Sequence, residues 1–241
     1  MIARSASHGL RREPQAKRRR VAGGAVASVA VALAVLIPAP VAAGGGSTIY
    51  YNARDGFKLS PNQANPSGPW SYRRSAPDGS RPLLDNFSEN AEPCGPSGDD
   101  INSWFGPEVL DLPAISRNAT GSDAFPCGAF FPEHALMAHP GGEHQLVLRW
   151  TSPMAGTIRV RAAIIDRDAY CGDGVYWAIR LDNQPAIAKG RIDNGGWMTG
   201  LRTGPYPVDA GSRLELRLGP RGSNSCDTTQ LRLRIALTPA I

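Results

Sequence analysis

Aromatic side chains in loop-like stretches are the residues of this sequence best suited to binding chemistry. A protein binds a sugar by laying its apolar C–H face on an exposed ring, while polar side chains hydrogen-bond its hydroxyls. Trp197, which lies between Gly196 and Gly200, is the preferred platform, and Trp104 comes next. Alternatively, such rings fold back and close the ends of a β structure. The five candidates that stand beside Gly, Pro, Asn or Ser are Trp197, Trp104, Trp70, Tyr72 and Tyr206.

Four aspartates form a second candidate site: Asp166, Asp168, Asp173 and Asp227. The first three surround Cys171, and a disulfide between Cys171 and Cys226 would bring the fourth beside them. Calcium takes six to eight oxygen ligands from carboxylates and loop carbonyls, so the cluster could hold a structural calcium ion. Alternatively, these side chains accept backbone N–H bonds in turns or pair with Arg167. We predict no other cofactor.

Three histidines five residues apart, His134, His139 and His144, alternate with Glu133 and Glu143 in a Pro/Gly-rich stretch. They could ligate a transition metal or supply an acid–base pair. A spacing of five fits neither a helix face nor a strand face, which favours a solvated loop. No nucleophile elbow, Walker loop or dinucleotide fingerprint is present, and we predict no catalytic residue.

Arginines recur at the polar positions of several segments, and they could form a patch for an anionic glycan or teichoic polymer. A solvated sheet face accounts for the same residues. The residues are Arg159, Arg161, Arg180, Arg213, Arg217, Arg232 and Arg234.

The amino-terminal residues resemble an export leader. A basic stretch, residues 1–20, runs into the uncharged apolar stretch 21–37 and a small-residue run that ends at Ala43. We expect cleavage after Ala43; the alternative is a retained membrane anchor, and either places the rest of the chain outside the cell. The leader holds seven of the 26 basic residues and one of the 21 acidic ones, which leaves 19 against 20. The near-neutral remainder excludes nucleic acid as a partner, and only this segment would meet a membrane.

Four cysteines follow the leader, at Cys94, Cys127, Cys171 and Cys226. An even count in an exported chain indicates two disulfides, and we favour Cys94 with Cys127 and Cys171 with Cys226. No Cys-x-x-Cys spacing exists, which argues against zinc.

Apolar residues alternate with polar ones in five segments: 146–150, 158–164, 175–181, 214–218 and 231–237. This period of two is typical of strands with one buried face. No segment has the period of an amphipathic helix that could cover that face, so a second sheet must do so. We therefore predict an all-β fold, a two-sheet antiparallel β-sandwich of the jelly-roll type, preceded by an N-terminal signal or anchor helix.

Composition predicts the domain organisation. We expect residues 1–43 to be a signal peptide or N-terminal membrane anchor, and residues 44–241 to be one β-sandwich domain. Within it, residues 44–140 are rich in Pro, Gly, Ser and Asn and should form loops and short strands, whereas 141–241 hold the regular strands.

Several turn and strand pieces resemble a recurring domain of exported bacterial proteins, similar to carbohydrate-binding modules with a galactose-binding-like or jelly-roll sandwich. The resemblance spans nearly all of residues 44–241 and implies a sandwich fold more than an activity. Its pieces are Asn65–Tyr72, His139–Gly141, Arg149–Thr157, Gly172–Val175 and Asp227–Thr229.

Together these features predict a secreted or envelope-surface, non-catalytic module that binds polysaccharide or cell-envelope glycan. One alternative is a structural or protein-interaction domain of the cell envelope. Another is a jelly-roll polysaccharide lyase or hydrolase, which would need one of the histidines close to an acid in a cleft.

Overall fold

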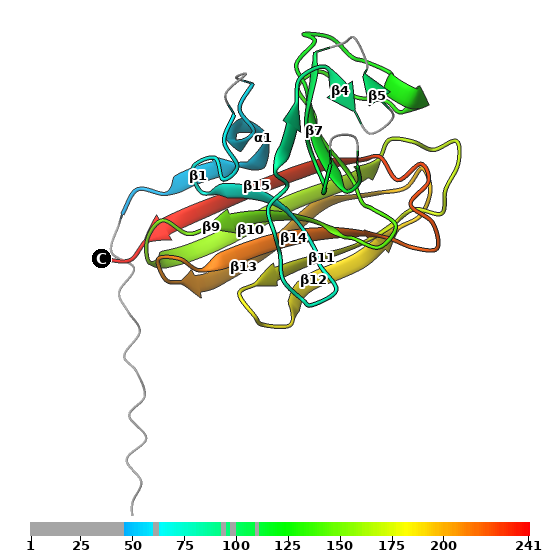
Figure 1. The fold of residues 1–241 in the computed structure, drawn as a ribbon. Helices are drawn as coiled ribbons and strands as arrows, with labels where there is room; N and C mark the ends of the chain where they lie inside the picture. Colours follow the sequence, from blue (N-terminus) through cyan, green and yellow to red (C-terminus); the bar gives the residue numbers. More distant parts are fainter. Residues whose placement is uncertain (1–45, 60–62, 93–94, 97–99, 109–110) are drawn as a thin grey trace, which may run out of the picture. The chain divides into compact units, whose positions relative to one another are not determined.

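The computed structural model describes residues 46–241 except 60–62, 93–94, 97–99 and 109–110. The expected leader and Cys94 lie outside the described residues. Two antiparallel sheets form a sandwich, as Figure 1 shows, with a small two-stranded ribbon beside them. In the described part of the chain, no helix combines the length and apolarity needed to span a membrane. The predicted all-β, two-sheet fold is therefore confirmed.

The larger sheet has eight strands. Seven of them form a continuous series in which each strand pairs with its spatial neighbours. The eighth, β1, pairs with β15 along the same edge of β15 as β8. In spatial order the strands are β13 (Trp197–Val208), β10 (Gly156–Asp166), β15 (Thr229–Pro239), β8 (Leu136–His139), β7 (Ala114–Asn118), β6 (Ile101–Phe105) and β3 (Asn86–Ser88), with β1 (Ile49–Asn52).

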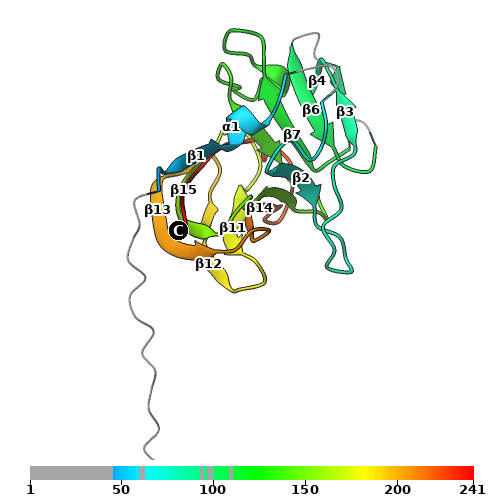
Figure 2. The ribbon, with the colours of Figure 1, turned by 90° about the vertical axis from the view of Figure 1, so that its left-hand side faces the viewer.

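The smaller sheet has five strands, and their order is β12 (Ala186–Ile192), β11 (Val175–Leu181), β14 (Arg213–Pro220), β9 (Leu146–Thr151) and β2 (Trp70–Arg74). In Figure 2, the strands β13 and β15 form one wall of the sandwich, and β11 and β14 form the other. The remaining elements are the ribbon β4 (Ala91–Glu92) and β5 (Gly95–Pro96), the short helix α1 (Ala53–Gly56) and the 3₁₀ turn η1 (Pro126–Gly128).

The main core lies between the two sheets and includes the inward residues of the predicted alternating segments. Leu146, Leu148 and Trp150 of β9 are at most 1% exposed, and they share one apolar cluster with the inward residues of the opposite sheet. Apolar burial contributes about 25 cal/mol per Å², so this interior is the main source of stability. The inward residues from the opposite sheet are Ile158, Val160, Ala162, Ile164, Leu231, Leu233, Ile235 and Leu237.

Two long strands carry no alternation that predicts them. The strand β12 contains Ala-Ile-Ala-Lys-Gly-Arg, and β13 is interrupted by Gly200, Gly204, Pro205 and Pro207. Proline and glycine weaken central strands but are tolerated at sheet edges and bulges. Both strands lie at an edge of their sheet, and β13 pairs with β10 through two register shifts.

The disulfide between Cys171 and Cys226 is present as predicted, with Cα atoms 5.5 Å apart. It joins the loop before β11 to the loop before β15. Cys127 is also disulfide-bonded. The pairing predicted for it involves Cys94, which lies outside the described residues.

Candidate functional site

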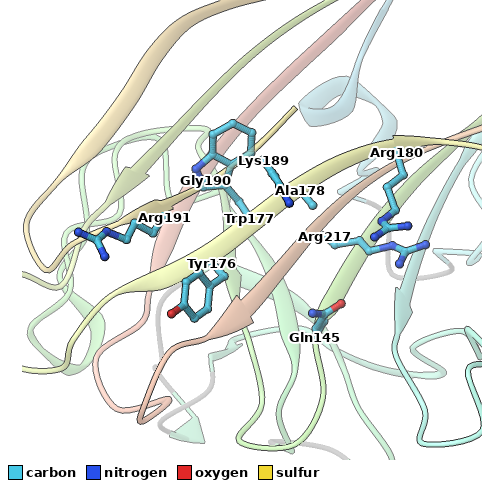
Figure 3. A pocket seen from close by; sticks show the side chains of 9 residues that line it. All are labelled: Gln145, Tyr176, Trp177, Ala178, Arg180, Lys189, Gly190, Arg191 and Arg217. Atoms are coloured by element: carbon cyan, nitrogen blue, oxygen red, sulfur yellow. The ribbon is translucent and has the colours of Figure 1, made fainter. Parts of the chain in front are cut away.

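The outer face of the five-stranded sheet holds a pocket of about 550 Å³. Its lining side chains come from β11, β12, β14 and the residue before β9 (Figure 3). Cross-strand pairing places them together, because Tyr176 is opposite Arg191 and Ala178 is opposite both Lys189 and Arg217. Directly opposed residues project from the same side of a sheet.

An aromatic surface and polar groups meet in this pocket. Tyr176 is 52% exposed, and the Arg221 guanidinium lies 5.9 Å from the centroid of its ring. Trp177 points into the core, yet its indole also lines the pocket, beside the edge residue Gly190. A Cβ at Gly190 would lie about 3.0 Å from the indole. The glycine therefore lets the edge strand pack closely on the ring.

A network of buried charges occupies the same face next to the pocket. Glu215 is 4% exposed and accepts hydrogen bonds from two arginines. Arg149 Nε donates to Oε1 at 2.9 Å, and Arg149 Nη2 donates to that oxygen as well. Arg217 Nε donates to Oε2 at 2.8 Å, and Arg217 Nη2 also donates to Oε2. Burial alone would raise the Glu215 pKa, but these bonds and charges hold it below its usual value of 4.5. Glu215 is thus a stable carboxylate that fixes both guanidinium planes.

A second pocket, of about 300 Å³, opens over this network. Arg73, Arg81 and Arg213 line it together with Arg149 and Arg217. Burial and the neighbouring Arg149 lower the pKa of Arg73, so the guanidinium groups are close enough to repel one another. The two pockets share Arg217 and lie on the same face of the five-stranded sheet.

Three of the five aromatic candidates are buried, which corrects the expectation that they present an open ring. Trp70 and Tyr72 of β2 are at most 2% exposed and belong to the main core. Trp104 of β6 is 5% exposed, packs on Phe87 and donates its indole N–H to Gln63 Oε1. Their rings contribute apolar burial, which is the alternative that the sequence left open.

The other two candidates differ in exposure. Tyr206 is half-buried, and its hydroxyl is hydrogen-bonded to Thr203. Trp197 is 70% exposed at the start of β13, opposite Ile165 on the larger sheet. It remains an accessible platform, although it does not line the pocket around Tyr176.

Sequence reasoning did not select Tyr176 as a ligand contact. The available signal was its place at an outward position of an alternating strand, where a large ring has no core to join. Its cross-strand partner Arg191 and the nearby Lys189 belong to β12, which the sequence did not reveal as a strand. Without that strand the surface around the ring could not be foreseen.

The predicted arginine patch divides between two faces. Arg180, Arg213 and Arg217 lie on the outer face of the five-stranded sheet, around the two pockets. The others, Arg159, Arg161, Arg232 and Arg234, are exposed on the outer face of the larger sheet. A single patch is therefore not formed.

Two of the four aspartates serve as backbone acceptors. Asp166 accepts the N–H groups of Asp168, at 2.9 Å, and Gly195, at 2.7 Å. Asp173 accepts the N–H of Gly222 at 2.7 Å. These bonds stabilise the loops around the disulfide, as the turn interpretation predicts.

Asp227 is in a different situation. It is 1% exposed, and among the described residues neither carboxylate oxygen has a hydrogen-bond partner. Burial first, and then the charges of Asp173 and Asp166, raise its pKa from 3.8 to about 7. Asp168 is also buried, and one of its oxygens lies within 4.8 Å of both sulfurs of the Cys171–Cys226 disulfide. Calcium prefers oxygen ligands, and this group of Asp168 with two disulfide sulfurs does not supply them. Calcium binding by the four aspartates therefore stays a prediction.

The three histidines lie at different places: before β8, at its end and in the turn that follows it. His134 precedes β8 and forms a 3.0 Å contact with Glu133, while His139 ends that strand. The strand holds these two side chains apart, because each residue of a strand advances the chain by about 3.3 Å. His139 is buried, which lowers its pKa, and its Nδ1 lies 2.8 Å from the carbonyl oxygen of Pro140. His144 lies in the turn that follows, where its carbonyl accepts the N–H of Gly141.

Comparison with known proteins gives limited likeness. No protein-family model matches the sequence, and no curated protein is significantly similar to it. The chain is similar to the CBM51 from Clostridium perfringens GH95, solved in complex with methyl-galactose, with 12% identity over 55% of this chain and 91% of that one and a TM-score of 0.35. It is also similar to the K1 cleaved adhesin domain of Lys-gingipain from Porphyromonas gingivalis W83, with 12% identity over 81% of this chain and all of that one and a TM-score of 0.32.

Proposed function

We propose that residues 44–241 are an exported, non-catalytic module that binds polysaccharide or cell-envelope glycan on the outer face of the five-stranded sheet. The observation that carries the proposal is the pocket around Tyr176, which combines a half-exposed ring with hydrogen-bonding side chains. A sugar ring stacks its C–H face on Tyr176, and Gln145 and Arg217 bond its hydroxyls.

The scaffold supports this role. The lining residues project from paired strands, and such elements hold a site more precisely than loops do. A volume of about 550 Å³ lies within the range of roughly 300–1,000 Å³ typical of small-ligand sites. The opening on a sheet face also lets a longer polymer continue beyond the pocket.

Export is supported by the disulfide chemistry. The Cys171–Cys226 bond persists in an oxidising compartment, such as the outside of a bacterial cell. Together with the leader predicted at residues 1–43, it supports a location of the binding face outside the cell, where envelope glycans are found.

The proposal is tested by binding the purified full chain to a glycan array, alongside two aromatic variants. Tyr176→Ala should weaken binding at least tenfold, which corresponds to about 1.4 kcal/mol, since it removes the stacking surface. Trp197→Ala is the control, because it removes an exposed ring from the other sheet; we expect less than a twofold change.

The opposite pattern, with binding lost in Trp197→Ala and kept in Tyr176→Ala, would move the platform to β13 and reject the pocket. A folded protein that binds no glycan on the array would reject the proposed function and favour a protein-interaction domain of the envelope.

A further inference from the structure

Positive charge is concentrated on one part of the five-stranded sheet. Five arginines line the second pocket: Arg73, Arg81, Arg149, Arg213 and Arg217. They come from β2, β9, β14 and the turn after β2, so the sheet register brings together residues that are distant in sequence. Directly paired residues such as Arg217, Val147 and Arg73 form one row across three strands.

The carboxylates at this pocket do not balance these charges. In the part of the chain that the structure describes, Glu215 and Asp182 are the two acids that line it. Glu215 is already saturated by Arg149 and Arg217, and Asp182 uses one oxygen to accept the backbone N–H of Arg213. Arg73, Arg81 and Arg213 therefore have no lining carboxylate devoted to them.

Backbone oxygens hold two of the remaining arginines, Arg73 and Arg81, in place. Arg73 Nη1 donates to the Arg81 carbonyl at 2.6 Å, and Arg81 Nη1 donates to the Ser80 carbonyl at 2.9 Å. Burial and the charges of Arg217 and Arg149 lower the pKa of Arg81. A like-charged group kept together against repulsion is stabilised by a bound anion, and the arginine fork matches a carboxylate, phosphate or sulfate.

We infer that this arginine pocket binds the anionic group of a polysaccharide whose neighbouring sugar lies on Tyr176, so that the ligand is an acidic rather than a neutral glycan. The inference rests on the proposed function and specifies its ligand class. Arg217 lines both pockets, which allows one polymer to occupy them together. A uronic carboxylate and a phosphodiester both present the pair of oxygens that an arginine fork recognises, and the polymers compared below distinguish the two.

The experiment compares three polymers on the full chain: a neutral polysaccharide, a polyuronate and a polyol-phosphate polymer. The inference predicts at least tenfold tighter binding of one acidic polymer over the neutral one, and loss of that preference at high salt. The variant Arg73→Gln/Arg213→Gln should remove the preference, since it deletes two charges and leaves the Glu215 pairs intact. Arg213→Gln alone, at an exposed side chain, should reduce the preference and serves if the double variant does not fold.

The matched control is Arg159→Gln, which removes an exposed arginine from the other sheet and should change nothing. Equal affinity for neutral and acidic polymers, with Tyr176→Ala still weakening both, would overturn the inference and leave the proposed function standing. Inorganic phosphate that shifts the NMR signals of the arginine side chains, without any glycan binding, would instead support the anion pocket and reject the glycan function. If neither polymer nor phosphate binds, both are rejected.

Discussion

Two buried carboxyl groups in this sandwich, those of Glu215 and Asp227, have pKa values shifted in opposite directions. Glu215 accepts paired hydrogen bonds from two arginines, and its pKa lies below 4.5. Asp227 is as deeply buried, but its oxygens have no hydrogen-bond partner in the described part of the chain, and its pKa rises to about 7. Burial penalises both charges in the same way, so the neighbouring groups decide which carboxyl stays ionised: arginines lie beside Glu215, whereas other carboxylates lie near Asp227.

The difference also separates two kinds of region. On the sheet face, register places arginines directly beside the acid, which produces a fixed, charged surface suited to a ligand. Around the Cys171–Cys226 disulfide, Asp173, Asp166 and Asp168 lie near Asp227, and among the described residues Arg221 is the cation that lowers the pKa of Asp227. Protonation of Asp227 relieves this repulsion, and a bound cation would do the same.

The largest effect should follow from Glu215→Gln. It leaves Arg149 and Arg217 unpaired, and breaking a buried pair from one side costs roughly 3–5 kcal/mol. Urea unfolding at pH 7 measures this loss. The pKa of Glu215 is lower in the folded chain than in the unfolded chain, so its stabilisation is present above the unfolded pKa and disappears as the pH falls through the folded pKa. The difference in unfolding free energy between wild type and variant should therefore become smaller in acid.

Glu133→Gln, at an exposed pair with His134, is the control and should change stability by less than about 0.5 kcal/mol. A Glu215→Gln cost as small as the control's would refute the comparison.

Asp227→Asn should act in the opposite direction. Between about pH 4 and pH 7 the unfolded chain ionises Asp227 while the folded chain keeps the proton, so the wild-type free energy of unfolding falls as the pH rises. The variant lacks this penalty and should gain on the order of 3 kcal/mol relative to wild type across that range, in the absence of divalent cations. Chemical denaturation in EDTA at pH 4 and pH 7.5 checks the sign, with the exposed Asp209→Asn as control. A variant that is less stable than wild type at pH 7.5 would show that the folded protein needs the charge.

Added calcium should change the stability least, and it should affect Asp227 but not Glu215. If the four aspartates bind Ca²⁺ with a dissociation constant of about 0.1–1 mM, 10 mM CaCl₂ stabilises the fold by roughly 1.4–2.7 kcal/mol. The shift should vanish in Asp227→Asn and persist in Glu215→Gln. Equal stability with and without calcium would leave protonation as the explanation for Asp227.

Much of the fold could be predicted because strand alternation is a local signal. The segment 146–150 is β9 with its apolar residues facing inward, and the Cys171–Cys226 bond joins the predicted cysteines. Exposure of single aromatic residues could not be predicted in the same way. Trp70 and Trp197 both stand beside glycine or proline in sequence, yet the first is buried beneath α1 residue Gly56 and the second is open. Whether a neighbouring element covers a ring depends on contacts that sequence spacing does not report.

The sequence by itself determined that this chain is a disulfide-linked, two-sheet β protein, since a period of two and apolar burial leave few other ways to cover the strands. Only the tertiary structure decided that Tyr176, Arg191 and Arg217 would share one face, and that Glu215 would be paired while Asp227 has no hydrogen-bond partner among the described residues. Strand order and register set these distances, and both arise from packing between segments far apart in the chain.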